Sequence, residues 1–251
     1  MASRAEQAAR GGPPNKNDGA SDSQARHRTG PASIKPPRWL KAAVFIAACL
    51  PLAFIVASLA SDLLRDTRYL GSNPIKEIEH FTGKWALRFL MFTLAITPLM
   101  RLSKWGWLVR YRRTFGLFAF FYACVHLLTY AVLDVELSWA EMFEDVLERK
   151  YITIGMTAFI LLLPLAITST KGWIKRLGAA RWNGLHRLVY AVVVLGTIHF
   201  FMAVKKDIRE PLVFAGIFAV LLGWRIFMWQ RARVAARTMP DVPPSPLVAD
   251  R

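Results

Sequence analysis

The sequence predicts an all-α membrane protein that folds as a bundle of six transmembrane helices. Of its 251 residues, 54% are hydrophobic, and these residues gather in six stretches near the ~20 residues that cross a ~30 Å hydrocarbon core. The formal net charge of +16 is carried mainly by the segments outside the stretches, the tails included. The predicted spans cover approximately residues 40–61, 84–100, 115–133, 152–168, 187–204 and 211–229.

The first span follows a polar N-terminal segment. Residues 1–38 are rich in Gly, Pro, Ser and charged side chains, and they cannot bury enough apolar surface to fold alone. The segment is too polar for the apolar region of a secretory signal, so we expect 40–61 to be a retained helix. The predicted organisation is a disordered tail over 1–38, a membrane domain over 39–230 and a second tail over 231–251.

The second span is the shortest, and Lys84 and Arg88 interrupt it. It nevertheless contains the run ALRFLMFTLAITPLM, which is too apolar for a surface loop. The interiors of the third and fifth spans each contain one histidine among apolar residues, His126 and His199.

The distribution of charge predicts the orientation. Lys and Arg concentrate in the cytoplasmic segments of membrane proteins, close to the membrane. The segments that are basic and nearly free of acids are the tail before Trp39, the loops 101–113 and 169–187, and the tail after Trp229. Most acids lie in 61–80 and 134–150. We therefore expect both termini in the cytoplasm. With six spans, the loop 205–210 must then lie outside. Because the positive charge lies in short juxtamembrane loops, a nucleic-acid-binding module is not expected.

The sequence excludes several redox and metal sites. Its two cysteines, Cys49 and Cys124, both lie inside predicted spans, which excludes a CxxC pair, a cysteine-ligated iron–sulfur cluster and the usual structural zinc site. It also lacks a dinucleotide-binding fingerprint and a Walker loop. Any NAD(P)H chemistry must therefore come from another chain.

His126 and His199 are predicted to lie at one depth in the membrane. His126 is thirteen residues from Arg113 and His199 twelve from Arg187, or ~20 Å and ~18 Å along a helix. An imidazole in hydrocarbon needs a partner, and two neutral imidazoles at one depth are the natural axial pair of a b-type haem. We predict that they bind the haem iron. The alternative is that each is a core histidine bonded to a backbone carbonyl or a neighbouring helix.

Arg88 and His80 are further candidates for cofactor contact. Arg88 lies thirteen residues from Arg101, so it either offers a counter-charge to haem propionates or snorkels to the outer interface. His80 lies at the outer end of the second span. It either touches an outer haem edge or a periplasmic partner, or is a solvated loop histidine.

His186 is predicted to lie ~20 Å below His199, so it cannot bind the same iron. The position facing it on the third span is around Arg113, which leaves a second bis-histidine haem unsupported. His186 is therefore a possible single ligand of an inner haem, a contact to a flavin or quinone, or an interfacial histidine.

Four blocks of the sequence together resemble the MsrQ (formerly YedZ) family of haem-binding membrane subunits, which is related to ferric-reductase and NADPH-oxidase transmembrane domains. The blocks are 73–99, 112–130, 152–170 and 181–200, and the resemblance extends over about 40–230. It implies a ferric-reductase-like fold with functional histidines at His126, His186 and His199, and it carries over His80 and Arg88 in HFTGKWALRF. Phe115 departs from the pattern, since Leu is common there.

The resemblance implies transmembrane electron transfer in the bacterial inner membrane. Electrons would enter from a cytoplasmic flavin reductase or the quinone pool, pass by way of haem b with FMN as a further cofactor, and reach MsrP, a periplasmic molybdopterin enzyme that reduces methionine sulfoxide in oxidised proteins. The chain would then be an electron-transfer subunit rather than a complete enzyme. The alternatives are a stand-alone ferric or quinone-linked transmembrane reductase and a haemless membrane anchor.

Overall fold

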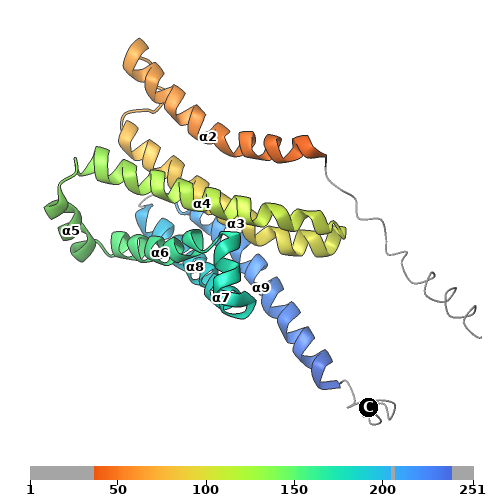
Figure 1. Cartoon of the computed structure of the whole chain (residues 1–251). Helices are drawn as coiled ribbons and strands as arrows, with labels where there is room; N and C mark the ends of the chain where they lie inside the picture. The colour runs from red at the N-terminus through yellow and green to blue at the C-terminus, as the bar shows by residue number, and fades with distance from the viewer. Residues whose placement is uncertain (1–36, 205–206, 239–251) are drawn as a thin grey trace, which may run out of the picture. The chain divides into compact units, whose positions relative to one another are not determined.

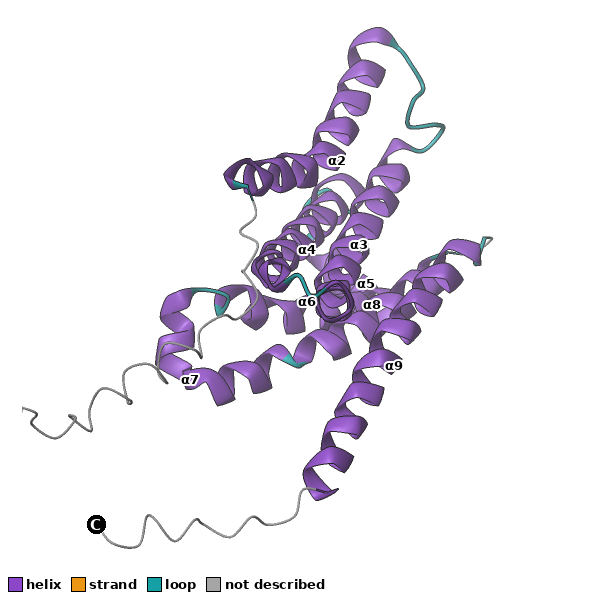
Figure 2. Cartoon of the chain, turned by 90° about the vertical axis from the view of Figure 1, so that its right-hand side faces the viewer, coloured by secondary structure: helices purple, strands orange, loops and turns teal. Residues whose placement is uncertain are grey.

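The computed structural model describes residues 37–204 and 207–238, and every regular element in them is a helix (Figures 1 and 2). Six helices are long and apolar enough to cross a membrane, which confirms the predicted all-α class and six spans. They are built on α2 (Arg38–Arg65), α3 (Pro74–Ser103), α4 (Val109–Thr129), α6 (Lys150–Ile167), α8 (Leu188–Ala203) and α9 (Arg209–Thr238). The predicted tail over 1–38 lies outside the described residues except for its last two, as do Lys205, Lys206 and the end of the predicted tail from residue 239.

The second span is longer than its hydropathy predicts. Helix α3 begins at Pro74, ten residues before the predicted start, because the side chain of Asn73 accepts a hydrogen bond from the backbone N–H of Lys76 at 3.1 Å. Proline at the first helical position is also favourable. Lys84 therefore lies inside the helix, ~15 Å from its start.

Two of the segments between spans are also helical. The acidic segment contains α5 (Trp139–Glu148), where Ser138 accepts from the backbone N–H of Glu141, and the basic segment contains α7 (Lys171–His186). Helical geometry in α7 is interrupted at Gly178, whose φ of 74° favours glycine. The short helices η2 (Gly106–Leu108) and η3 (Tyr130–Asp134) extend the third span at its two ends.

The core lies where two closely packed helix pairs meet, α3 with α4 and α6 with α8. Leu94, Ala119 and Val193 are fully buried there. By contrast, large apolar side chains elsewhere on the spans, including Phe45 and Leu128, remain exposed, as expected for surfaces that face lipid.

Tyr122 connects α4 to the turn of α2 that contains Pro51. Pro51 disturbs α2, and the Tyr122 hydroxyl donates to the backbone oxygen of Ala48 at 2.9 Å and accepts from the N–H of Leu52 at 3.0 Å. These two backbone groups would otherwise bond to each other along the helix. The fully buried hydroxyl therefore joins two helices while keeping both groups hydrogen-bonded.

Arg225 connects three helices in the same way. From α9 it donates to the hydroxyl of Tyr190 on α8 at 2.8 Å, and to Thr97 Oγ1 and the Leu94 carbonyl on α3 at 3.1 and 3.2 Å. The sixth predicted span contains this arginine in its interior, where a guanidinium needs such partners.

We expect Tyr122→Phe to destabilise the membrane domain by about 1–3 kcal/mol, because the bridging hydroxyl between Ala48 and Leu52 is lost. The measurement is the thermal unfolding midpoint of the purified protein in detergent. The matched control is Tyr111→Phe, because Tyr111 is also buried on α4 and no hydrogen bond of its hydroxyl is found in the described part of the chain. Equal midpoints for the two variants would contradict the bridging role.

Candidate functional site

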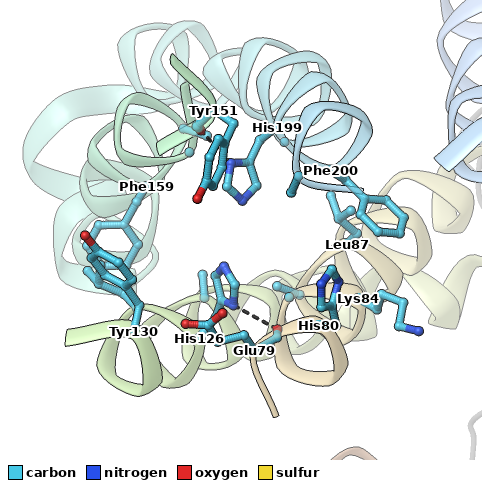
Figure 3. Close-up of a pocket in the computed structure, with 18 of the residues that line it drawn as sticks. Glu79, His80, Lys84, Leu87, His126, Tyr130, Tyr151, Phe159, His199 and Phe200 are labelled. Atoms are coloured by element: carbon cyan, nitrogen blue, oxygen red, sulfur yellow. Dashed lines mark hydrogen bonds between the residues drawn. The ribbon is translucent and has the colours of Figure 1, made fainter. Parts of the chain in front are cut away.

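A cavity of about 1190 Å³ lies between α3, α4, α6 and α8 (Figure 3). It is larger than most small-molecule pockets, which measure ~300–1,000 Å³. Polar and charged side chains line it toward one end, where the lining includes Lys76, Glu79, His80, Lys84, Asp134, Arg149 and Asp207. Residues from the helix interiors, including Leu87, Leu90, Ala119, Leu162 and Val192, form an apolar lining.

His126 from α4 and His199 from α8 face each other across this cavity (Figure 3). Their ring centroids are 6.1 Å apart and the ring planes are inclined by 74°. A metal–imidazole bond is ~2 Å long, so two rings that share one metal ion have centroids roughly 6 Å apart once the ring radii are added. The structure thus brings together the two histidines at the separation that a shared metal ion requires.

A backbone carbonyl fixes the tautomer of each ring. His126 Nδ1 donates to the oxygen of Glu79 on α3 at 3.0 Å, and His199 Nδ1 donates to the oxygen of Tyr151 on α6 at 2.7 Å. A carbonyl only accepts, so Nδ1 carries the proton and Nε2 of the neutral ring keeps its lone pair. The alternative interpretation, a core histidine bonded to a backbone carbonyl, therefore describes a bond that each ring does make. That bond uses Nδ1 and leaves Nε2 available as a ligand.

A glycine on the neighbouring helix makes room for each ring. A Cβ at Gly155 would lie 2.6 Å from His199 Nδ1, and one at Gly83 would lie 3.2 Å from His126 Cε1. Each glycine is four residues after the carbonyl that the histidine binds, one helical turn further along. Both imidazoles therefore lie against bare backbone, in the same arrangement on two different helix pairs.

Sequence reasoning did not identify Gly83 and Gly155. The available signal is a glycine inside an apolar helical segment, away from any turn, where it costs ~1 kcal/mol relative to alanine and so needs a packing reason. That signal does not say which side chain the glycine admits.

Ion pairs surround the charged end of the cavity. Lys84 Nζ lies 3.0 Å from Glu210 Oε2 on α9, and Lys76 Nζ lies 3.5 Å from both Glu79 and Asp134. The cavity is therefore amphipathic, with an apolar interior and a rim that offers both signs of charge.

His80 lines the cavity, whereas Arg88 does not. The cavity-facing residues of α3 include Gly83, Leu87 and Leu90, which share one face, and Arg88 is turned ~100° from Leu87. Its guanidinium lies over the Trp85 ring, 4.8 Å from the centroid.

His186 also lies outside the cavity, at the end of α7. Its ring stacks on Trp182 with centroids 3.8 Å apart, and its Nδ1 donates to the Trp182 carbonyl at 3.1 Å. Its Nε2 is buried and has no hydrogen-bond partner among the described residues. Of the four histidines singled out in the sequence, His126 and His199 form the facing pair, His80 lines the same cavity and His186 lies apart from it.

The two imidazoles alone do not make a metal site. Within residues 37–204 and 207–238, no group of three or more His, Cys, Asp or Glu side chains could hold a metal ion. A metal ion bound by His126 and His199 must therefore bring its other donors with it, as a porphyrin does. The amphipathic cavity fits such a group, because a haem has an apolar macrocycle and charged propionates.

Comparison with known proteins finds one matching family model and a set of similar membrane subunits. Residues 82–197 match the family model described as ferric reductase like transmembrane component. Three relatives share the name protein-methionine-sulfoxide reductase heme-binding subunit MsrQ. The one from Xanthomonas euvesicatoria is 47% identical over 205 residues, 82% of this chain and 94% of its own. The one from Xanthomonas oryzae is 49% identical over 77% of this chain and 88% of its own. The one from Herminiimonas arsenicoxydans is 50% identical over 76% of this chain and 87% of its own. With its six spans, the chain is a multi-pass membrane protein.

Proposed function

The chain belongs to the MsrQ family, and from that premise we propose that it is the haem-binding membrane subunit of a methionine-sulfoxide reductase system. The observation that carries the proposal is the facing pair of imidazoles, 6.1 Å apart in an amphipathic cavity. His126 and His199 are the proposed axial ligands of a b-type haem. A haem with two histidine ligands supplies one-electron transfer without an open position for oxygen.

The protein's own residues set the conditions for that chemistry. The carbonyls of Glu79 and Tyr151 hold both rings in one tautomer and orientation, and such outer hydrogen bonds also raise the basicity of a ligating imidazole. The walls on the inner side of the rim are apolar. At the rim, Lys76, Lys84 and Arg149 are the cations proposed to balance propionate charge, a role for which Arg88 was the sequence candidate.

The proposed electron route runs from the cytoplasm to the periplasm of a bacterial inner membrane. It rests on the charge asymmetry, because the cavity rim lies beside the acidic segments that the positive-inside rule places outside. The proposed acceptor is MsrP, the periplasmic molybdopterin enzyme, and the proposed donors are the quinone pool or a cytoplasmic flavin reductase. His186, whose buried Nε2 lacks a partner, is the proposed contact for FMN or a quinone on the inner side.

A haemless anchor is the weaker proposal, because anchoring needs only hydrophobicity and gives no reason for a cavity with two facing imidazoles. A stand-alone ferric or quinone-linked reductase shares the haem site. It differs in its acceptor, so a transfer experiment separates it from the MsrP-linked function.

We expect His126→Ala and His199→Ala each to abolish the low-spin b-type spectrum, because each removes one axial ligand. His186→Ala is the control, since His186 lies outside the cavity; its spectrum persists while reduction from the inner side slows. The measurement is a dithionite-reduced minus oxidised spectrum of each purified variant. Normal haem content in either of the first two variants would exclude that histidine as a ligand.

The glycine contacts predict a graded loss of haem. Gly155→Ala places a methyl group 2.6 Å from the His199 ring, and Gly83→Ala places one 3.2 Å from the His126 ring, so we expect the first to lose more haem than the second. Gly216→Ala on α9 is the control, because a Cβ there meets nothing within 4 Å. Haem per chain is measured by pyridine haemochrome. Equal retention in all three variants would show that the glycines do not position the ligands.

Electron transfer is tested in proteoliposomes whose haem has been reduced from the inside. We expect external MsrP with a methionine-sulfoxide substrate to reoxidise the haem, with little reoxidation when MsrP is omitted. Equal reoxidation by an iron chelate without MsrP would favour the stand-alone reductase. The absence of haem from correctly folded protein would favour the anchor.

A further inference from the structure

Helix α5 has one apolar face and one acidic face. Trp139, Phe143 and Leu147 are four residues apart, which places them along one stripe, and their exposed fractions are 76%, 69% and 70%. Glu144 and Glu148 are turned ~100° from the stripe residue that precedes each of them, so they lie away from it on the side that also carries Glu141. We call the first set the apolar stripe. Three large, exposed apolar side chains in ten residues need a partner.

The position of α5 in the chain limits what that partner can be. It connects Asp134, where the third span ends, to Lys150, where α6 and the fourth span begin (Figure 1). It therefore lies at the face of the membrane that these two span termini share. Ten helical residues measure ~15 Å, about half of the ~30 Å hydrocarbon core, so α5 does not cross the membrane.

Contacts on both sides hold α5 at a fixed rotation. Asp145 accepts from the Tyr130 hydroxyl at 2.8 Å and lies 2.9 Å from Arg149 Nε. In addition, the Thr153 hydroxyl on α6 donates to the Val146 carbonyl. With its polar side tied to the ends of η3 and α6, the helix has little freedom to turn its stripe inward.

We propose that α5 is an interfacial helix that lies flat in the outer boundary of the bilayer, with the apolar stripe of Trp139, Phe143 and Leu147 embedded in lipid. A short helix with an aromatic and leucine face opposite a charged face binds at the boundary between headgroups and acyl chains, where tryptophan is enriched. Lipid is also what the two flanking spans already contact. The acidic face, with Glu141, Glu144 and Glu148, lines a small polar hollow at the cavity rim.

The lipid contact acts on the histidine cavity through two residues. Tyr130 and Arg149, which hold Asp145 of α5, both line that cavity, and a smaller acidic hollow beside α5 shares Lys76, Asp134 and Arg149 with it. A helix seated at the membrane surface thus fixes the rim of the cavity relative to the bilayer. This inference does not depend on the identity of the cofactor.

The test measures which solvent each face of α5 meets. Single nitroxide labels are placed at Phe143→Cys and Leu147→Cys on the stripe, and at Glu144→Cys and Glu148→Cys on the acidic face, in a full-length chain whose Cys49 and Cys124 are replaced by Ala. The protein is reconstituted in phosphatidylcholine vesicles, and collision with oxygen, which partitions into lipid, is compared with collision with a water-soluble nickel chelate. We expect the ratio of oxygen to nickel accessibility to be several-fold higher at the stripe positions.

Two other outcomes would overturn the proposal. High nickel accessibility at all four positions would show that α5 stands in water and that its stripe is free for a periplasmic protein. Exclusion of both reagents at 143 and 147, with dipolar broadening between labels, would show that a second copy of the chain covers the stripe.

A second experiment needs no label and so guards against disturbed folding. Phosphatidylcholine brominated near the headgroup should quench the tryptophan fluorescence of Trp139→Phe less than that of the unsubstituted chain. Equal quenching would contradict the proposal.

Discussion

The contact of an imidazole with the bare backbone of a neighbouring helix is the constraint on which this structure depends, and it occurs twice. In each case a histidine donates from Nδ1 to a backbone carbonyl and packs against a glycine one turn further along the same helix. His126 of α4 makes these contacts with α3, and His199 of α8 makes them with α6. The carbonyl sets the tautomer and the glycine sets the distance of approach. Because one such contact lies within each closely packed helix pair, the pairs and the facing rings are positioned together.

The same requirement, that a polar group inside a membrane must find a partner in the protein, accounts for the other ties between helices. Tyr122 keeps two backbone groups of α2 hydrogen-bonded beside Pro51, and Arg225 reaches acceptors on α3 and α8 from α9. Hydrophobicity does not drive these helices together, since lipid is as apolar as their surfaces. Specific polar contacts and close packing at small residues do so instead, and the cavity is the space left between the two pairs.

The charged and apolar parts of the cavity have different roles in the site. The interior walls are apolar, while the rim is built on ion pairs that involve α3, α9, and the ends of η3 and α5. The rim is therefore the part of the site in contact with the aqueous face and, through α5, with the membrane surface. His186 lies apart from this arrangement, stacked on Trp182, so the proposed contact for an electron donor is separate from the proposed ligand pair.

Properties that vary along the membrane normal could be predicted from the sequence alone. Hydrophobic length defined six spans, charge asymmetry predicted an orientation, and the fixed rise per residue placed His126 and His199 at one depth. The sequence misplaced the start of α3, because a cap at Asn73 outweighs polar residues within the helix. The pairing of the helices, the room that Gly83 and Gly155 leave for the rings, and the rotation of Arg88 out of the cavity became visible in the folded chain. Depth follows from counting residues along one helix, whereas rotation about a helix axis and the choice of neighbour follow from packing among residues far apart in the chain.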